Sequence, residues 1–213
     1  MALQALLVFS LLVVSSTTTN ALLQDFCVAD PAAPMSPDGF SCKSLDKVTV
    51  DDFVFSGLDQ PGNTSALVNS SFVPAFVTQL PGLNGLGLSL ARADLESGGV
   101  FPMHSHPSAT ESFVVVKGSL TAGFISSTAN TVYSKVLKAG DVFVVPPGLL
   151  HYVINTGADP AQVFVAFSSP RPGIQLADLA WFKSDLPSSV IQATTFLDPD
   201  QIKKLKALFG GTN

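Results

Sequence analysis

The sequence predicts an all-β fold, a roll or barrel built from two antiparallel sheets. Short segments rich in apolar and β-branched residues follow one another between residues 48 and 168, and turn residues separate them about every 8–12 positions. No segment in that range shows the period of an amphipathic helix. Hydrophobic residues make up 46% of the chain and charged residues only 13%, so the chain can form a substantial core and is not a disordered segment.

The strands are expected where apolar runs or alternating patterns lie between turn signals. A Pro-Gly-Leu-Asn-Gly turn at 81–85 and a polar turn at 126–131 separate several of these runs. Gly118 and Gly140 stand at strand entries, where a positive φ is often needed. The expected strands are residues 48–55, 72–80, 86–95, 113–116, 119–125, 132–137, 141–145, 152–155 and 161–167.

The chain changes character after Pro172, where short helices are expected over 174–182 and 188–193. Asp198 followed by Pro199 is typical of a helix start, with an N-cap and a proline at the first helical position. The following helix has an apolar stripe that needs a partner, either its own barrel or a second subunit. The stripe consists of Ile202, Leu205 and Leu208 or Phe209, and Gly210 and Gly211 end the helix.

All three histidines of the chain lie in two short stretches, 98–118 and 140–155. His104 and His106 are two residues apart, so on an extended segment their side chains point the same way. A turn at Pro107 and Ser108 can bring Glu111 back beside them, and His151 follows a strand and a tight turn.

Three imidazoles and one carboxylate without a competing thiolate suit a divalent transition metal such as Mn, Fe, Co, Ni, Cu or Zn. The alternative is three histidines without a shared role, and the common pattern of all three argues against it. Four protein ligands leave open coordination positions, which is typical of a catalytic site rather than a closed structural one.

The N-terminal residues indicate export. Residues 2–14 are nearly all apolar and residues 15–20 are small and polar, which predicts a signal peptide over residues 1–21 with cleavage after Ala21. The apolar run is too short to span a bilayer, and no other stretch is long enough, so we expect a soluble secreted protein. In that compartment Cys27 and Cys42 are expected to form a disulfide, which closes a 16-residue loop and stabilises the fold by about 3 kcal/mol.

Two N-glycosylation sequons begin at Asn63 and Asn69, both in a polar segment that is expected to be surface loop. On an exported chain we expect at least one of them to be occupied. The net charge is −5 and there is no basic patch, so nucleic acid is not an expected partner.

The two histidine stretches match both cupin motifs with every spacing met. The first reads G-x5-H-x-H-x4-E-x6-G and the second G-x5-P-x-G-x2-H-x3-N. Residues 24–30, Gln-Asp-Phe-Cys-Val-Ala-Asp, resemble the N-terminal box of plant germins. The sequence thus resembles the germin-like proteins over essentially the whole mature chain, and most closely the group that includes auxin-binding members.

The resemblance implies a cupin jelly-roll β-barrel with short C-terminal α-helices. It divides the chain into a signal peptide (1–21), a disulfide-closed N-terminal segment (22–47), the barrel (48–170) and a C-terminal helical extension (171–213). Germins carry a disulfide at the matching cysteines. Their C-terminal helices clasp a neighbouring subunit, which implies a homo-oligomer here, a hexamer built as a trimer of dimers.

The resemblance also implies Mn²⁺ bound by the residues that match the ligands of germins, with superoxide dismutase activity in the extracellular space, the apoplast or the cell wall. An alternative is a binding protein for a small carboxylate such as an auxin. A third reading is a storage or wall protein with a relic site, against which four intact ligands argue. The implied metal ligands are His104, His106, Glu111 and His151, and the candidate pocket residues are Asn84, Phe101, Met103 and Phe113.

Oxalate oxidation is not expected. Cereal germins that oxidise oxalate place two asparagine side chains near the metal, and the matching positions here are Asn84 and Ala91. Alanine has no hydrogen-bond donor, and each partner that an oxalate dianion lacks costs about 1–3 kcal/mol or more.

Overall fold

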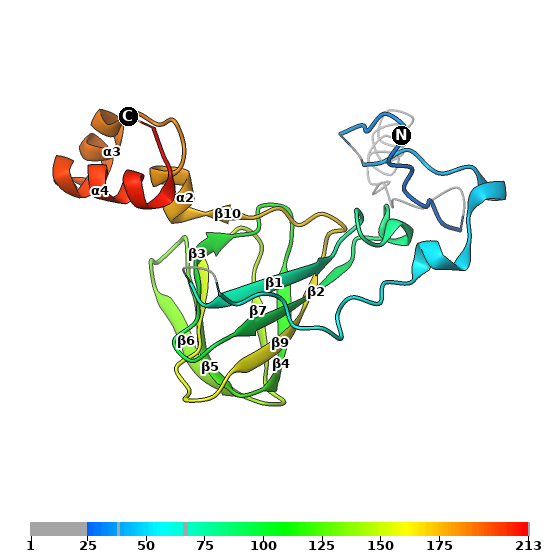
Figure 1. Cartoon of the computed structure of the whole chain (residues 1–213), viewed down its shortest axis with the longest axis horizontal. Helices are drawn as coiled ribbons and strands as arrows, with labels where there is room; N and C mark the ends of the chain where they lie inside the picture. The colour runs from blue at the N-terminus through cyan, green and yellow to red at the C-terminus, as the bar shows by residue number, and fades with distance from the viewer. Residues whose placement is uncertain (1–24, 38, 66–67, 213) are drawn as a thin grey trace, which may run out of the picture.

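Two five-stranded antiparallel sheets form the centre of the molecule in the computed structural model, which describes residues 25–37, 39–65 and 68–212 (Figure 1). One sheet has the strand order β1-β2-β9-β4-β7 and the other β10-β3-β8-β5-β6, which confirms the expected double-sheet roll. The strands are β1 Ser70–Ala75, β2 Ser89–Leu95, β3 Val100–Ser105, β4 Glu111–Lys117, β5 Ser119–Ile125, β6 Val132–Lys138, β7 Val142–Val145, β8 His151–Ile154, β9 Ala161–Phe167 and β10 Gln175–Leu176.

The core lies between the two sheets and follows from alternation along the strands. In β9 every second residue is buried, namely Ala161, Val163, Val165 and Phe167. β9 is the central strand of its sheet, paired with both β2 and β4. The inward side chains of these strands form one cluster with those of β5 and β8, such as Leu120 and Val153.

The expected strand at 48–55 is wrong. The segment contains the 3₁₀ helix η2 (Val50–Phe53), which follows another, η1 (Leu45–Lys47). A third, η3 (Pro81–Leu83), occupies the predicted turn, so the range 48–168 is not free of helix. The cause is local hydrogen bonding that competes with sheet pairing. The Asp52 carboxylate accepts from the backbone N–H of Thr49 at 2.8 Å and pairs with Lys43 at 2.9 Å.

The expected strand at 72–80 is shorter than its apolar run. β1 ends at Ala75, and a turn follows in which the N–H groups of Gln79 and Leu80 donate to the carbonyl of Phe76. β1 is the edge strand of its sheet, which is where its proline, Pro74, is tolerated. Gly118 and Gly140 have positive φ, at 79° and 91°, as expected for their strand entries.

Three C-terminal helices pack mainly on one another and stand beside the barrel, on the side away from the N-terminal segment (Figure 1). They are α2 (Ala177–Phe182), α3 (Ser188–Thr195) and α4 (Pro199–Phe209). Their small core is Phe182, Ile191 and Ile202. The predicted start of α4 is confirmed, since the Asp198 side chain accepts from the N–H of Asp200.

The disulfide between Cys27 and Cys42, present as expected, closes a loop within the N-terminal segment. The backbone N–H of Ala29 also donates to the carbonyl of Pro81 at 3.0 Å. The predicted signal peptide, residues 1–21, lies outside the described residues. Within the described residues, no helix combines the length and the apolar character needed to cross a bilayer.

Candidate metal centre

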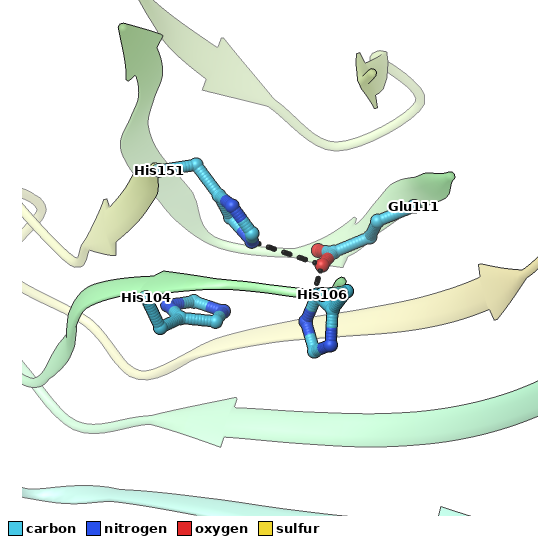
Figure 2. Close-up of side chains that lie close together, drawn as sticks. All are labelled: His104, His106, Glu111 and His151. Atoms are coloured by element: carbon cyan, nitrogen blue, oxygen red, sulfur yellow. Dashed lines mark hydrogen bonds and ion pairs between the residues drawn. The ribbon is translucent and has the colours of Figure 1, made fainter. Parts of the chain in front are cut away.

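Three strands bring the four predicted ligands together. His104 lies near the end of β3 with His106 just beyond it, Glu111 begins β4, and His151 begins β8. His104 and His151 are directly opposite each other in the pairing of β3 with β8. All four are buried, with at most 6% of each residue exposed, and one donor atom from each lies within 4.8 Å of the others (Figure 2). The convergence that the spacing predicted is therefore present.

Backbone carbonyls hold all three imidazoles in the same way. A carbonyl oxygen only accepts, so the Nδ1 atom that faces it carries the proton and the Nε2 atom is left with its lone pair. The Nδ1 atom of His104 lies 2.7 Å from the Pro102 oxygen, that of His106 2.5 Å from the Gly173 oxygen and that of His151 2.9 Å from the Leu149 oxygen. Each ring thus has the tautomer that a metal ligand needs.

The Glu111 carboxylate occupies the middle of the group. Its Oε2 atom is 3.0 Å from Nε2 of His106 and 3.1 Å from Nε2 of His151 (Figure 2). When the protons are on Nδ1, the lone pairs of both Nε2 atoms face the lone pairs of the carboxylate oxygen and repel it. The arrangement is stable only with additional protons or with a cation between these atoms. The residues therefore fit a metal ion by their own geometry.

The pKa values of Glu111 and His104 also favour the protonation states that bind a metal. Burial alone would raise the pKa of Glu111, but in the metal-free group hydrogen bonds from His106 and His151, which require a proton on Nε2, outweigh burial and lower that pKa to about 2. Burial, reinforced by the nearby His151, lowers the pKa of His104 from 6.5 to about 4. At neutral pH the carboxylate is ionised and His104 is neutral, which are the forms that bind metals.

A cavity of about 650 Å³ adjoins this group and reaches the C-terminal helices. His104, His106 and Glu111 contribute to its wall, and most of the remaining lining is apolar. Aromatic side chains dominate, with Phe72, Phe76, Phe101, Phe113 and Phe167 among them. The metal group is thus the polar end of a cavity whose wall is otherwise mostly apolar.

The predicted pocket residues separate into two groups. Phe101 and Phe113 line the cavity, whereas Met103 and Asn84 do not. The Nδ2 atom of Asn84 donates to the Phe40 carbonyl at 2.9 Å and lies 3.2 Å from the Cys27 sulfur, so this side chain ties the N-terminal segment to η3. Both sequon asparagines, Asn63 and Asn69, are exposed. The second sequon is only partly in the expected loop, since its Ser70 and Ser71 are buried in β1.

Sequence reasoning missed Gly173, whose carbonyl orients His106 from 67 positions away. It also missed the aromatic wall formed by Phe72, Phe76 and Phe167, since apolar residues on strands are ordinarily core. No local pattern marks a backbone oxygen as a partner of a distant side chain. The Pro-Gly pair at 172–173 indicates only a turn.

The sequence pattern of the cupin family matches residues 56–203. An auxin-binding protein of Prunus persica is 55% identical over 197 residues, 92% of this chain and 94% of that protein. Germin-like protein subfamily 3 member 3 of Arabidopsis thaliana is 52% identical over 97% of both chains. A solved oxalate oxidase is 39% identical, with a TM-score of 0.85 over 90% of this chain and 98% of that one. The chain therefore belongs to the germin-like proteins of the cupin family.

Proposed function

We propose that this protein is a manganese-binding superoxide dismutase of the plant cell exterior. The observation that carries the proposal is the buried group of three imidazoles and one carboxylate, in which the Nδ1 atom of each imidazole faces a backbone carbonyl. Bound manganese would supply the two oxidation states that disproportionation of superoxide to dioxygen and hydrogen peroxide requires. Manganese itself is inferred from the germin-like resemblance, because the donor set also suits other divalent metals.

The chain's own residues have three tasks in this function. The imidazoles of His104, His106 and His151 would provide nitrogen donors at fixed orientation, and Glu111 would provide the single negative charge. Because four donors do not complete an octahedron, an anion as small as superoxide has room to bind. The apolar wall limits competing water. The net charge of −5 gives no overall attraction for an anion, so capture depends on the site itself.

A second candidate is binding of a small aromatic carboxylate, such as an auxin. The observation that favours it is the cavity, since about 650 Å³ far exceeds what superoxide needs and falls within the range of organic ligand sites. A ligand carboxylate would meet the metal end while its ring lies against Phe72, Phe101 or Phe167. The 55% identity to a protein named for auxin binding supports this candidate.

One preparation can separate the two candidates. Metal analysis of purified protein should give about one manganese per chain, and superoxide and oxalate assays follow on the same sample. Dismutase activity that disappears with the metal supports the enzyme. Saturable binding of indole-3-acetate to manganese-loaded protein that lacks dismutase activity would favour the second candidate instead.

The metal site itself is tested by His151→Ala and Glu111→Ala. Each substitution removes one of four donors, and we expect metal content to fall to about a tenth or less at micromolar protein. Lys135→Ala, an exposed change on β6, is the matched control and should retain full metal. A Glu111→Ala or His151→Ala protein with full manganese content and full dismutase activity would rule out this site.

The proposed setting is the apoplast or cell wall. The disulfide, the predicted signal peptide and two sequons whose asparagines, Asn63 and Asn69, are exposed support secretion and N-glycosylation. The proposed assembly is a homo-oligomer, a hexamer built as a trimer of dimers, as the germin-like resemblance implies. Superoxide or a small carboxylate is the proposed small-molecule partner, and nucleic acid is not.

A further inference from the structure

The linker between the barrel and the helical extension, residues 171–176, contacts the metal group directly. It follows β9 after residues 168–170 and ends in β10, which pairs with β3 so that Leu176 lies opposite His104 and Gln175 opposite Ser105. Gly173, Ile174 and Leu176 also form part of the cavity wall. One short segment therefore adjoins the ligands, the cavity and the start of α2.

His106 depends on this linker in a way that the other two ligands do not. The carbonyls that orient His104 and His151 belong to residues two positions earlier in the chain, Pro102 and Leu149. The carbonyl that orients His106 belongs to Gly173, 67 positions later. The tautomer and ring angle of His106 are therefore set only when the linker lies in place.

Gly173 can present its carbonyl because it is glycine. Its φ is +65°, a region that residues with a Cβ seldom adopt. A Cβ at this position would meet only Pro107, at 3.8 Å, so there is room for a methyl group and the constraint is purely one of backbone conformation. A residue that leaves this conformation turns the carbonyl away from Nδ1 of His106.

We infer that the linker is a positioning element of the metal centre, in which the Gly173 carbonyl fixes His106 and thereby couples metal affinity to the docking of the helical extension. This rests on the proposed metal site. Since coupling between two equilibria is reciprocal, a metal bound to His106 also holds the linker against β3. The helices α2 to α4 follow the linker, so their attachment to the barrel is firmer in the metal-loaded protein.

Gly173→Ala is the test, and Gly87→Ala is its matched control. Gly87 also has a φ of +65°, is exposed and has nothing within 4 Å of an added Cβ, but it lies in the turn before β2, away from the metal group. Both variants should lower the unfolding midpoint of the metal-free protein by a similar amount. Only Gly173→Ala should weaken Mn²⁺ binding, by about tenfold or more, in competition with a chelator.

The electron paramagnetic resonance spectrum of bound Mn²⁺ gives a second readout that a general loss of stability would not move. It should differ from wild type in Gly173→Ala and match wild type in Gly87→Ala. If Gly173→Ala equals the control in affinity and in spectrum, the inference is overturned while the metal site stands. If neither wild type nor Gly87→Ala binds Mn²⁺, the proposed metal centre fails and the inference fails with it.

Hydrogen exchange of the unmodified full-length protein tests the same inference should Gly173→Ala not fold. Loading with Mn²⁺ should slow amide exchange in the peptide that covers residues 172–180, compared with chelator-treated protein. The hairpin turn at 126–131 serves as the internal reference and should not change. Equal exchange rates in 172–180 with and without the metal would overturn the inference.

Discussion

At the scale of single residues, His104 and Glu111 make the metal-free protein sensitive to acid. The pKa of His104 is about 4 in the fold and 6.5 otherwise, so the unfolded chain binds the extra proton between these values. The free energy of unfolding should therefore fall by on the order of 3 kcal/mol between about pH 7 and pH 4. The pKa of Glu111, lowered from 4.5 to about 2, continues the loss below pH 4.5.

Urea unfolding of chelator-treated protein at several pH values measures this dependence. His104→Gln removes the titrating ring, so its stability should vary much less between about pH 7 and pH 4. Wild-type protein that is equally stable at both ends of that range would contradict the assignment of a buried neutral His104.

Neither Asn84 nor Ala91, the two positions that match the asparagines of cereal germins, offers a free hydrogen-bond donor to oxalate in this structure. The Asn84 side chain is engaged with Phe40 and Cys27, and Ala91 is fully buried in the core of the barrel. An oxalate dianion would lack hydrogen bonds worth about 1–3 kcal/mol each. We predict oxalate oxidation roughly tenfold to a few hundredfold below that of a cereal germin, or none.

Hydrogen peroxide release from oxalate by manganese-loaded protein checks this prediction, with a cereal germin assayed in parallel. Ala91→Asn should raise a weak activity if that position faces the substrate. Because Ala91 is buried among apolar side chains, the variant also needs a stability measurement before its activity is interpreted. A rate for the unmodified protein like that of the cereal enzyme would show the prediction to be wrong.

The four candidate ligands could be predicted from sequence because their spacing matches strand geometry, in which residues two apart share a face. The partners that orient them could not. The oxygens of Pro102 and Leu149 are local backbone atoms without a sequence signal, and Gly173 becomes a partner only through the pairing of β10 with β3.

At the scale of elements, alternation predicts a strand best where one face of that strand is buried against the opposite sheet. Residues 161–167 agree with β9 at both ends for that reason. Residues 48–55 look similar in sequence, but several of their large apolar side chains, including Val50 and Val54, are exposed. Because the segment has no apolar face to bury, the local hydrogen bond between Thr49 and Asp52 determines its conformation, and it forms η2.

The N-terminal segment gives a prediction about processing. We expect the secreted protein to begin near Leu22 and to carry the bridge between Cys27 and Cys42. Intact mass spectrometry after enzymatic deglycosylation measures both. Reduction of the bridge should lower the free energy of unfolding by about 3 kcal/mol, because the 16-residue loop regains freedom in the unfolded chain. Two free thiols, or an uncleaved leader, would refute the expectation.

At the scale of the whole molecule, the helical extension buries a small core of its own and still exposes other apolar side chains. In α4, Ile202 is buried while Leu208 is 58% exposed. The sequence left open whether Leu208 or Phe209 completes the stripe, and the structure selects Phe209, whose ring stacks on Phe182. The helical period alone does not separate neighbours at the edge of a stripe.

Phe196 has an environment in the helical extension that is unfavourable for a phenylalanine in a single subunit. Its side chain is 90% exposed, and its backbone has a φ of 60° at the C-cap of α3, where glycine is usual. Both features are unfavourable for a phenylalanine in an isolated subunit. We expect a neighbouring subunit of the proposed hexamer to cover this ring, which would stabilise each contact by about 2 kcal/mol.

Phe196→Gly tests this expectation because it relieves the backbone conformation while it removes the ring. The isolated subunit should be as stable as wild type or more so, yet the molar mass in light scattering should fall below that of the hexamer. Asn130→Gly is the control, since Asn130 has a φ of 52° in the exposed turn between β5 and β6 and should leave the mass unchanged. A Phe196→Gly protein with the mass of wild type, or a monomeric wild type, would contradict assembly through the helical extension.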